Sequence, residues 1–259
     1  MPEKRIKFRY QGGAADDGWL NLYDGSKALE GIARTTSIIT HAYLNGEIRT
    51  RGEAAHGAEF YVRAPRRGSF VYEAVIWTSG TISGGLFYDF VKYAFSEALG
   101  NFDQSEKRRK ALDERIEPTL GELGAVLESP LDDVHRPIRK DLDIELYVTR
   151  PRGEVLAHFD ADTAAQLLPR TVEPPHDIVG NVTRYNTNTG WGRFYDHIEG
   201  RSVSFVLDQR IGQRDRSLIT WSLHESNMKR DGLLTFDGDA LVSSTGNIKR
   251  YNVGSVVER

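Results

Sequence analysis

The last third of the chain, residues 178–259, shows no helical periodicity, and this feature limits the possible folds more than any other. It contains short runs rich in Val, Ile, Phe, Tyr and Thr, separated by Gly, Asn and Asp. These runs cover residues 180–186, 191–196, 202–207, 217–223, 232–236 and 246–257. Short strands with closely spaced turns are typical of a small barrel or sandwich. We therefore expect a small all-β domain here.

The residues before this module alternate between strand and helix patterns. We expect strands at 5–10, 59–64, 69–77, 144–149 and 154–159, with hairpin turns at 65–68 and 151–153. We expect helices at 24–44, capped by Asp24 or Ser26, and at 86–99, 104–117, 119–128 and 130–141, with a short one starting at Asp160 or Asp162. The adjacent Pro174 and Pro175 favour an extended linker. The chain therefore divides into an α+β domain (1–170), a Pro-rich linker (171–177) and a β domain (178–259).

Composition excludes several classes of site. The chain has 259 residues and no cysteine, so disulfides, thiolate nucleophiles and cysteine-based metal sites are excluded. The net charge of −3 gives no global field that would select nucleic acid or membrane. The most apolar stretch, residues 70–99, is interrupted by charged residues and is not a membrane span. The N-terminus lacks the apolar core of a signal peptide, so we expect a cytoplasmic protein.

Two segments of the β module nearly repeat each other. Residues 180–186 read GNVTRYN and residues 246–252 read GNIKRYN. One interpretation is that both are strands of one barrel, with Val182 and Ile248 pointing inward. The alternative is a duplicated surface that brings four side chains side by side: Arg184, Tyr185, Arg250 and Tyr251.

The segment 180–195 resembles the cold-shock domain, a five-stranded OB-type barrel whose first two strands read roughly G-x-V-K-W-F-N-x-x-K-G-F-G-F-I. The matching positions are Gly180, Val182, Tyr185, Asn186, Gly190, Trp191 and Gly192. Arg184, Thr189 and Arg193 stand where that family has Trp, Lys and Phe. Together with the repeat, the resemblance favours a five-stranded OB- or SH3-like barrel over a sandwich.

In the cold-shock family, aromatic side chains on this face stack on the bases of single-stranded nucleic acid. The resemblance carries this role to Tyr185 and Trp191. Each base–aromatic stack contributes about 1–3 kcal/mol, while nearby cations hold the phosphates. Arg184, Arg193, Arg201 and Arg250 are the candidate cations, and Tyr251 joins the surface through the repeat.

The N-terminal region also resembles a known family. Residues 12–16 (GGAAD), 22–26 (LYDGS) and 31–34 (GIAR) are similar to an uncharacterised bacterial domain family. This resemblance brings no activity with it.

The nearest pattern to a metal site is the segment His158-Phe159-Asp160-Ala161-Asp162 at the end of an expected strand. His158 and Asp160 would share one face of an extended chain and could coordinate a metal together. The simpler interpretation, which we favour, is that Asp160 or Asp162 caps the following helix.

No catalytic group can be assigned from these patterns, and no cofactor is expected. The leading hypothesis is a non-enzymatic bacterial binding or assembly protein whose barrel contacts single-stranded nucleic acid or a protein partner. One alternative is an enzyme with a polar or metal site in the α+β domain, at His158, Asp160 and Asp162. Another is a purely structural component that forms a homo-oligomer.

Overall fold

The computed structural model describes residues 3–50, 55–63, 70–79, 84–100, 110–151, 153–244 and 246–259. The chain forms two compact units, Met1–Leu168 and Pro169–Arg259. Within the described ranges, every helix is too short or too polar to cross a membrane. The turn at 65–68, residues 104–109 of the helix expected at 104–117, and Arg152 lie outside the described residues.

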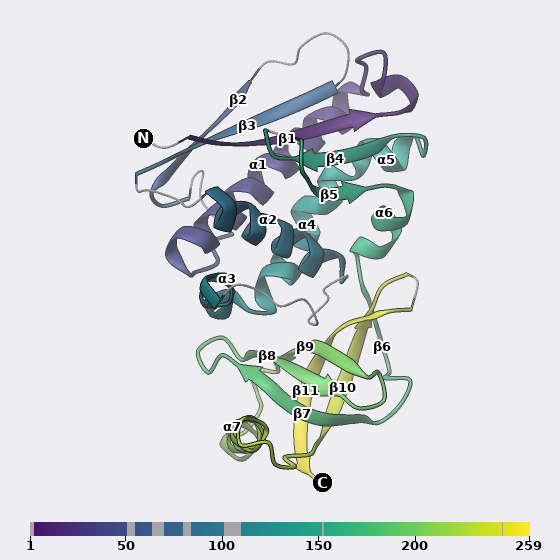
Figure 1. The fold of residues 1–259 in the computed structure, drawn as a ribbon. Coiled ribbons are helices and arrows are strands. Elements are labelled where there is room, and N and C mark those ends of the chain that lie inside the picture. The colour runs from purple at the N-terminus through teal and green to yellow at the C-terminus, as the bar shows by residue number, and fades with distance from the viewer. Residues whose placement is uncertain are drawn as a thin grey trace. The chain divides into compact units, whose positions relative to one another are not determined.

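The first unit is an antiparallel sheet with helices gathered on one side of it (Figure 1). The sheet order is β2-β3-β1-β4-β5, formed by β1 (Glu3–Gln11), β2 (Ala58–Arg63), β3 (Phe70–Thr78), β4 (Glu145–Thr149) and β5 (Val155–Phe159). Strand β1 alternates: Ile6, Phe8 and Tyr10 are buried, whereas Lys7 and Arg9 point to the other face. This alternation is the usual result when only one face of a sheet is covered.

The helices of this unit are α1 (Leu22–Asn45), α2 (Gly84–Leu99), α3 (Lys110–Ile116), α4 (Glu122–Val134), α5 (Arg136–Lys140) and α6 (Ala161–Leu167). Short 3-10 turns lie at η1 (Gly13–Ala15) and η2 (Glu117–Thr119). Helices α1 and α4 approach closely at Gly31, where a Cβ would lie 2.5 Å from the carbonyl oxygen of Pro130. A glycine is therefore required at this contact.

Two details of the helices differ from the sequence predictions. Asn21, and not Asp24 or Ser26, caps α1, because its side chain accepts hydrogen bonds from the backbone N–H groups of Tyr23 and Asp24. Pro130 was expected to separate two helices, but it lies inside α4. The expected end of this helix near residue 44 is confirmed: α1 ends at Asn45, and Gly46 follows in the left-handed conformation (φ 66°).

The second unit is a closed five-stranded barrel with one added strand and one helix. Its strands are β6 (Arg170–Val172), β7 (Ile178–Tyr185), β8 (Trp191–Asp196), β9 (Arg201–Leu207), β10 (Leu234–Val242) and β11 (Ile248–Glu258). The pairing runs β7-β8-β9-β11-β10 and closes from β10 to β7, and only the β9–β11 pair is parallel. This Greek-key closure is that of an OB-type barrel and confirms the predicted fold class. Residues 170–172, expected at the end of the first domain and in the linker, pair with β10 as β6.

The run 217–223 was predicted as a strand, and this prediction is wrong: it lies in helix α7 (Gln213–Asn227). The helix packs against β7 and β11 and buries Ile219 and Ser222. Helix α7 places Ser222 where it satisfies backbone groups of the barrel. Its Oγ accepts the backbone N–H of Val182 beside a bulge in β7 and donates to the carbonyl of Gly232. A buried backbone N–H freed by the bulge is thereby satisfied.

Candidate binding surface on the barrel and a pocket in the first unit

The outward face of β8 carries an aromatic–arginine–aromatic series. Side chains alternate along a strand, so Trp191, Arg193 and Tyr195 share one face while Phe194 and Asp196 point into the barrel. The neighbouring strand β9 sets Val206, Ser204 and Ser202 directly opposite these three residues. The series therefore lies on a strand pair of small and aliphatic neighbours.

Three arginines form a row across four strands of this face. Arg184 on β7 pairs with Arg193 on β8, Arg193 pairs with Ser204 on β9, and Ser204 pairs with Arg250 on β11. Arg193 and Ser204, in the middle of the row, are 5% and 4% exposed, whereas Arg184 and Arg250 at its ends are partly exposed. The two outer arginines are therefore the accessible members of the row, and Arg193 lies buried between them.

Tyr195 extends the surface beyond the residues that the sequence singled out. It is 41% exposed, two positions beyond Arg193 on the same strand. Trp191 is partly exposed. The strand alternation over 191–196 was the signal that could have identified Tyr195 from the sequence.

Two of the predicted surface residues lie elsewhere. Tyr251 is fully buried inside the barrel, where its hydroxyl donates to Asp196 Oδ2 at 2.8 Å. Burial, reinforced by Asp196, raises the pKa of Tyr251 far above its usual value, so the hydroxyl keeps its proton. The ring of Tyr185 is half-buried and stacks on Phe205 at 6.2 Å, and its hydroxyl accepts from Arg216.

The sequence repeat is explained by barrel packing. Val182 and Ile248 both point into the core, as the simpler interpretation expected. Strands β7 and β11 are separated by β8 and β9 along the sheet, so the repeat does not set Arg184 and Arg250 side by side. Instead, the two arginines mark the ends of the row.

The glycines of the segment 180–192 also have structural causes. A Cβ on Gly180 would lie 1.9 Å from the carbonyl oxygen of Tyr195, and one on Gly192 would lie 2.4 Å from the ring of Phe205. The absence of a side chain at both positions allows the strands to approach closely and coil tightly. The glycines that match the cold-shock pattern are therefore explained by barrel packing alone. Only the outward side chains can indicate a ligand.

The candidate metal residues form a small polar cluster on β4 and β5. His158 Nε2 lies 3.3 Å from Glu145 Oε2, and its Nδ1 lies 4.0 Å from Asp160 Oδ2. Asp160 caps α6 through a capping box with Thr163, as the favoured interpretation expected, and Asp162 lies in the first turn of that helix. In the part of the chain that the structure describes, no three such residues are placed to hold a metal ion.

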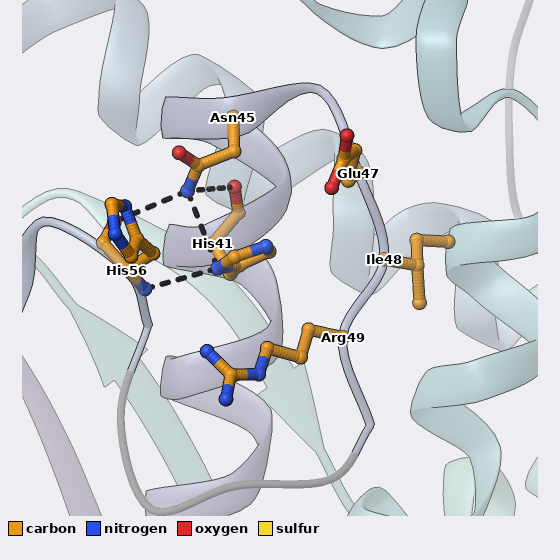
Figure 2. Close-up of a pocket in the computed structure, with 6 residues that line it drawn as sticks. All are labelled: His41, Asn45, Glu47, Ile48, Arg49 and His56. Atoms are coloured by element: carbon orange, nitrogen blue, oxygen red, sulfur yellow. Dashed lines mark hydrogen bonds between the residues drawn. The ribbon is translucent and has the colours of Figure 1, made fainter.

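A second polar site, which the sequence did not reveal, lies at the end of α1. It is a pocket of about 420 Å³ lined by His41, Asn45, Glu47, Ile48, Arg49 and His56 (Figure 2). His41 is only 6% exposed. Its Nδ1 lies 3.1 Å from the backbone N of His56 and 3.2 Å from Asn45 Nδ2. The two histidines are 15 residues apart, so no motif could indicate this contact.

The hydrogen bonds of His41 determine where its proton lies. The backbone N–H of His56 can only donate, so Nδ1 must accept and the neutral ring carries its proton on Nε2. Burial lowers the pKa of His41 below its usual value, and Arg49 acts in the same direction. His41 thus presents an uncharged N–H donor on Nε2. In Figure 2 this nitrogen points away from Asn45 and His56, toward the segment of Ile48.

Comparison with known proteins identifies the first unit alone. Residues 6–167 match the protein family described as Domain of unknown function (DUF7946). The matched residues end one position before the end of the first unit, and the barrel lies outside them. No curated protein and no solved structure matches the chain.

Proposed function

We propose that this chain, which belongs to the DUF7946 family through residues 6–167, is a binding protein whose C-terminal barrel holds single-stranded nucleic acid. The family description brings no activity, so the proposal rests on the side chains of the barrel. The first unit would serve as a platform for assembly or sensing.

The observation that carries the proposal is the outward face of β8. Trp191 and Tyr195 flank Arg193 there, and Arg184 and Arg250 lie at the two ends of the arginine row. Every base has a flat π-face, so aromatic side chains can stack on bases of any sequence, while arginines bind the phosphates. A surface that combines both groups suits a single strand, whose bases are unpaired.

The fold adds support of a general kind. OB-type barrels bind oligonucleotides on the face of their second and third strands, which here are β8 and β9. The resemblance of residues 180–195 to the cold-shock domain points to the same class of ligand. It assigns stacking to Trp191 and also to Tyr185, but the ring of Tyr185 packs on Phe205, so we replace it with Tyr195 because of its exposure.

Fluorescence anisotropy of the full chain with labelled oligonucleotides tests the proposal. A length of about 16 nucleotides covers the largest site size of one OB-type barrel. We expect binding of single-stranded DNA or RNA at low salt, with weaker binding of a duplex of the same sequence, because paired bases cannot stack on protein side chains. The absence of an anisotropy change with both single strands at low salt would overturn the proposal and leave a protein partner as the alternative.

A further inference from the structure

The pocket at the end of α1 has the features of a binding site that is independent of the barrel. It combines a cavity of about 420 Å³ with a histidine that is more than nine-tenths buried. Among the described residues, no group pairs with His41 Nε2, and this nitrogen points away from the ring's own hydrogen bonds. The residue is buried, but Nε2 itself is accessible, so water or a ligand in the pocket can accept its hydrogen bond.

The hydrogen-bonding groups that line the pocket indicate which class of ligand it can bind. His41 offers an N–H that can only donate, and Arg49 offers a guanidinium that can only donate. A protonated Nε2 has no lone pair for a metal, so this tautomer disfavours coordination. The groups that accept from an imidazole N–H and a guanidinium together are the oxygens of carboxylates and phosphates.

The volume of the pocket and the charge of Glu47 further limit the ligands that it can bind. Pockets for small molecules typically measure about 300–1,000 Å³, so this one lies near the lower end. Glu47 also lines it, and its carboxylate disfavours ligands with several negative charges. The same carboxylate can accept a hydrogen bond from an amino or hydroxyl group of the ligand.

We propose that this pocket binds a small organic anion through His41 Nε2–H and the guanidinium of Arg49, with Glu47 accepting from a donor group on the same molecule. The anionic group is a carboxylate or a phosphate. The site lies within the first unit, so it does not depend on the function proposed for the barrel.

The first test is the tautomer of His41 in the full chain. Long-range ¹H–¹⁵N correlation spectra distinguish a ring proton on Nε2 from one on Nδ1. We expect the Nε2–H form at neutral pH. The Nδ1–H form would overturn the proposal, because Nε2 would then be an acceptor facing the pocket.

The second test is titration of the full chain with glycine, acetate and inorganic phosphate, followed by the His41 ring signals. Ligands of four or five heavy atoms make few contacts, so we expect dissociation constants on the order of millimolar. Glycine should bind more tightly than acetate, because it also supplies a donor for Glu47. Shifts that do not saturate with any of the three probes would overturn the proposal.

Variants of Arg49 complete the test, since Arg49 is exposed and its replacement leaves the core intact. Arg49→Gln should weaken binding about tenfold or more, and Arg49→Lys should restore part of it, because a lysine keeps the charge but loses the planar fork. Arg9→Gln is the matched control. Arg9 is exposed and pairs with Val71, near the start of β3. His56 lies near the other end of β3, where Thr78 pairs with Ala58. Arg9 is therefore remote from the pocket. Equal affinity in the wild type and Arg49→Gln would contradict the assignment.

Discussion

The two units present polar groups in opposite ways. The first unit encloses them: His41 lies at the wall of a small pocket and His135 lies in the core. The second unit encloses Tyr251 and Asp196, but it carries Trp191 and the exposed Tyr195 on the outer side of one strand, with the largely buried Arg193 between them. A small pocket suits a small molecule, whereas an extended strand face suits a polymer. The difference therefore predicts two ligands of different size. Mutations in one unit should affect the binding of only one of them.

The largest effect is expected inside the barrel. Tyr251→Ala removes a fully buried ring and leaves Asp196 without its donor, which should cost about 3–5 kcal/mol of unfolding free energy. Tyr185→Ala, at the matching position of the repeat, should cost clearly less because that ring is half-buried. Hydrogen–deuterium exchange measured on peptides of β7–β11 would show the loss of protection. Equal losses for the two variants would contradict the assignment of Tyr251 to the core and Tyr185 to the rim.

The second largest effect is an acid sensitivity of the first unit. His135 is fully buried and its Nδ1 lies 2.7 Å from the carbonyl oxygen of Leu131. Burial lowers its pKa from 6.5 to about 4. The unfolded chain thus binds a proton that the folded chain does not, and stability falls as the pH drops from about 6.5 to about 4. The full loss is about 3 kcal/mol.

Urea unfolding at a series of pH values, followed by circular dichroism of the helices, would measure this loss. A His135→Gln variant should be less stable at pH 7 but should show a flatter dependence on pH, because the titrating group is gone. An unchanged pH dependence in the variant would show that other groups cause the acid sensitivity.

The third effect concerns the open face of β8. Trp191→Ala should weaken oligonucleotide binding by about 1–3 kcal/mol, or about 5- to 150-fold, through the loss of one stack. Tyr195→Ala should act in the same range. Tyr61→Ala is the control, because Tyr61 is exposed (57%) on β2 of the first unit. Anisotropy of the full chain measures all three, and an effect of Tyr61→Ala as large as that of Trp191→Ala would break the comparison between the units.

The smallest effect is a change in salt dependence. Each phosphate contact on a single strand contributes about −0.7 to the slope of log K against log salt. Arg184→Ala and Arg250→Ala should each reduce the slope by about this amount. Arg214→Ala, an exposed arginine on α7, should change it less. Equal changes for the three variants would indicate a diffuse electrostatic effect without specific phosphate contacts.

The sequence predicted the parts of the fold whose signals are local. Alternation in residues 5–10 and the turn residues around the barrel strands were sufficient, because strand period and turn chemistry are properties of neighbouring residues. Helix α7 was missed because Leu218, Ile219 and Trp221 suit a strand, and only packing on β7 decides otherwise. Propensity is a weak prior where tertiary contacts compete.

The sites were less predictable for a physical reason. The arginine row depends on the register between four strands, and one of its members, Arg250, follows Arg193 by 57 positions in the chain. The pocket depends on a backbone N–H of His56 that fixes the proton of His41. Neither the register between strands nor the tautomer of a histidine produces a recognisable sequence motif. The aromatic residues on β8 were accessible through simple alternation, and Tyr195 was overlooked there.

The indole N–H signals of the full chain test the central claim most directly. The protein has four tryptophans: Trp19, Trp77, Trp191 and Trp221. On addition of a single-stranded oligonucleotide, the account predicts a saturable shift or broadening of the Trp191 signal, with the signals of Trp19 and Trp77 unchanged. Binding that leaves Trp191 unperturbed, or that shifts the tryptophans of the first unit instead, would contradict the claim that the outward face of β8 holds the strand.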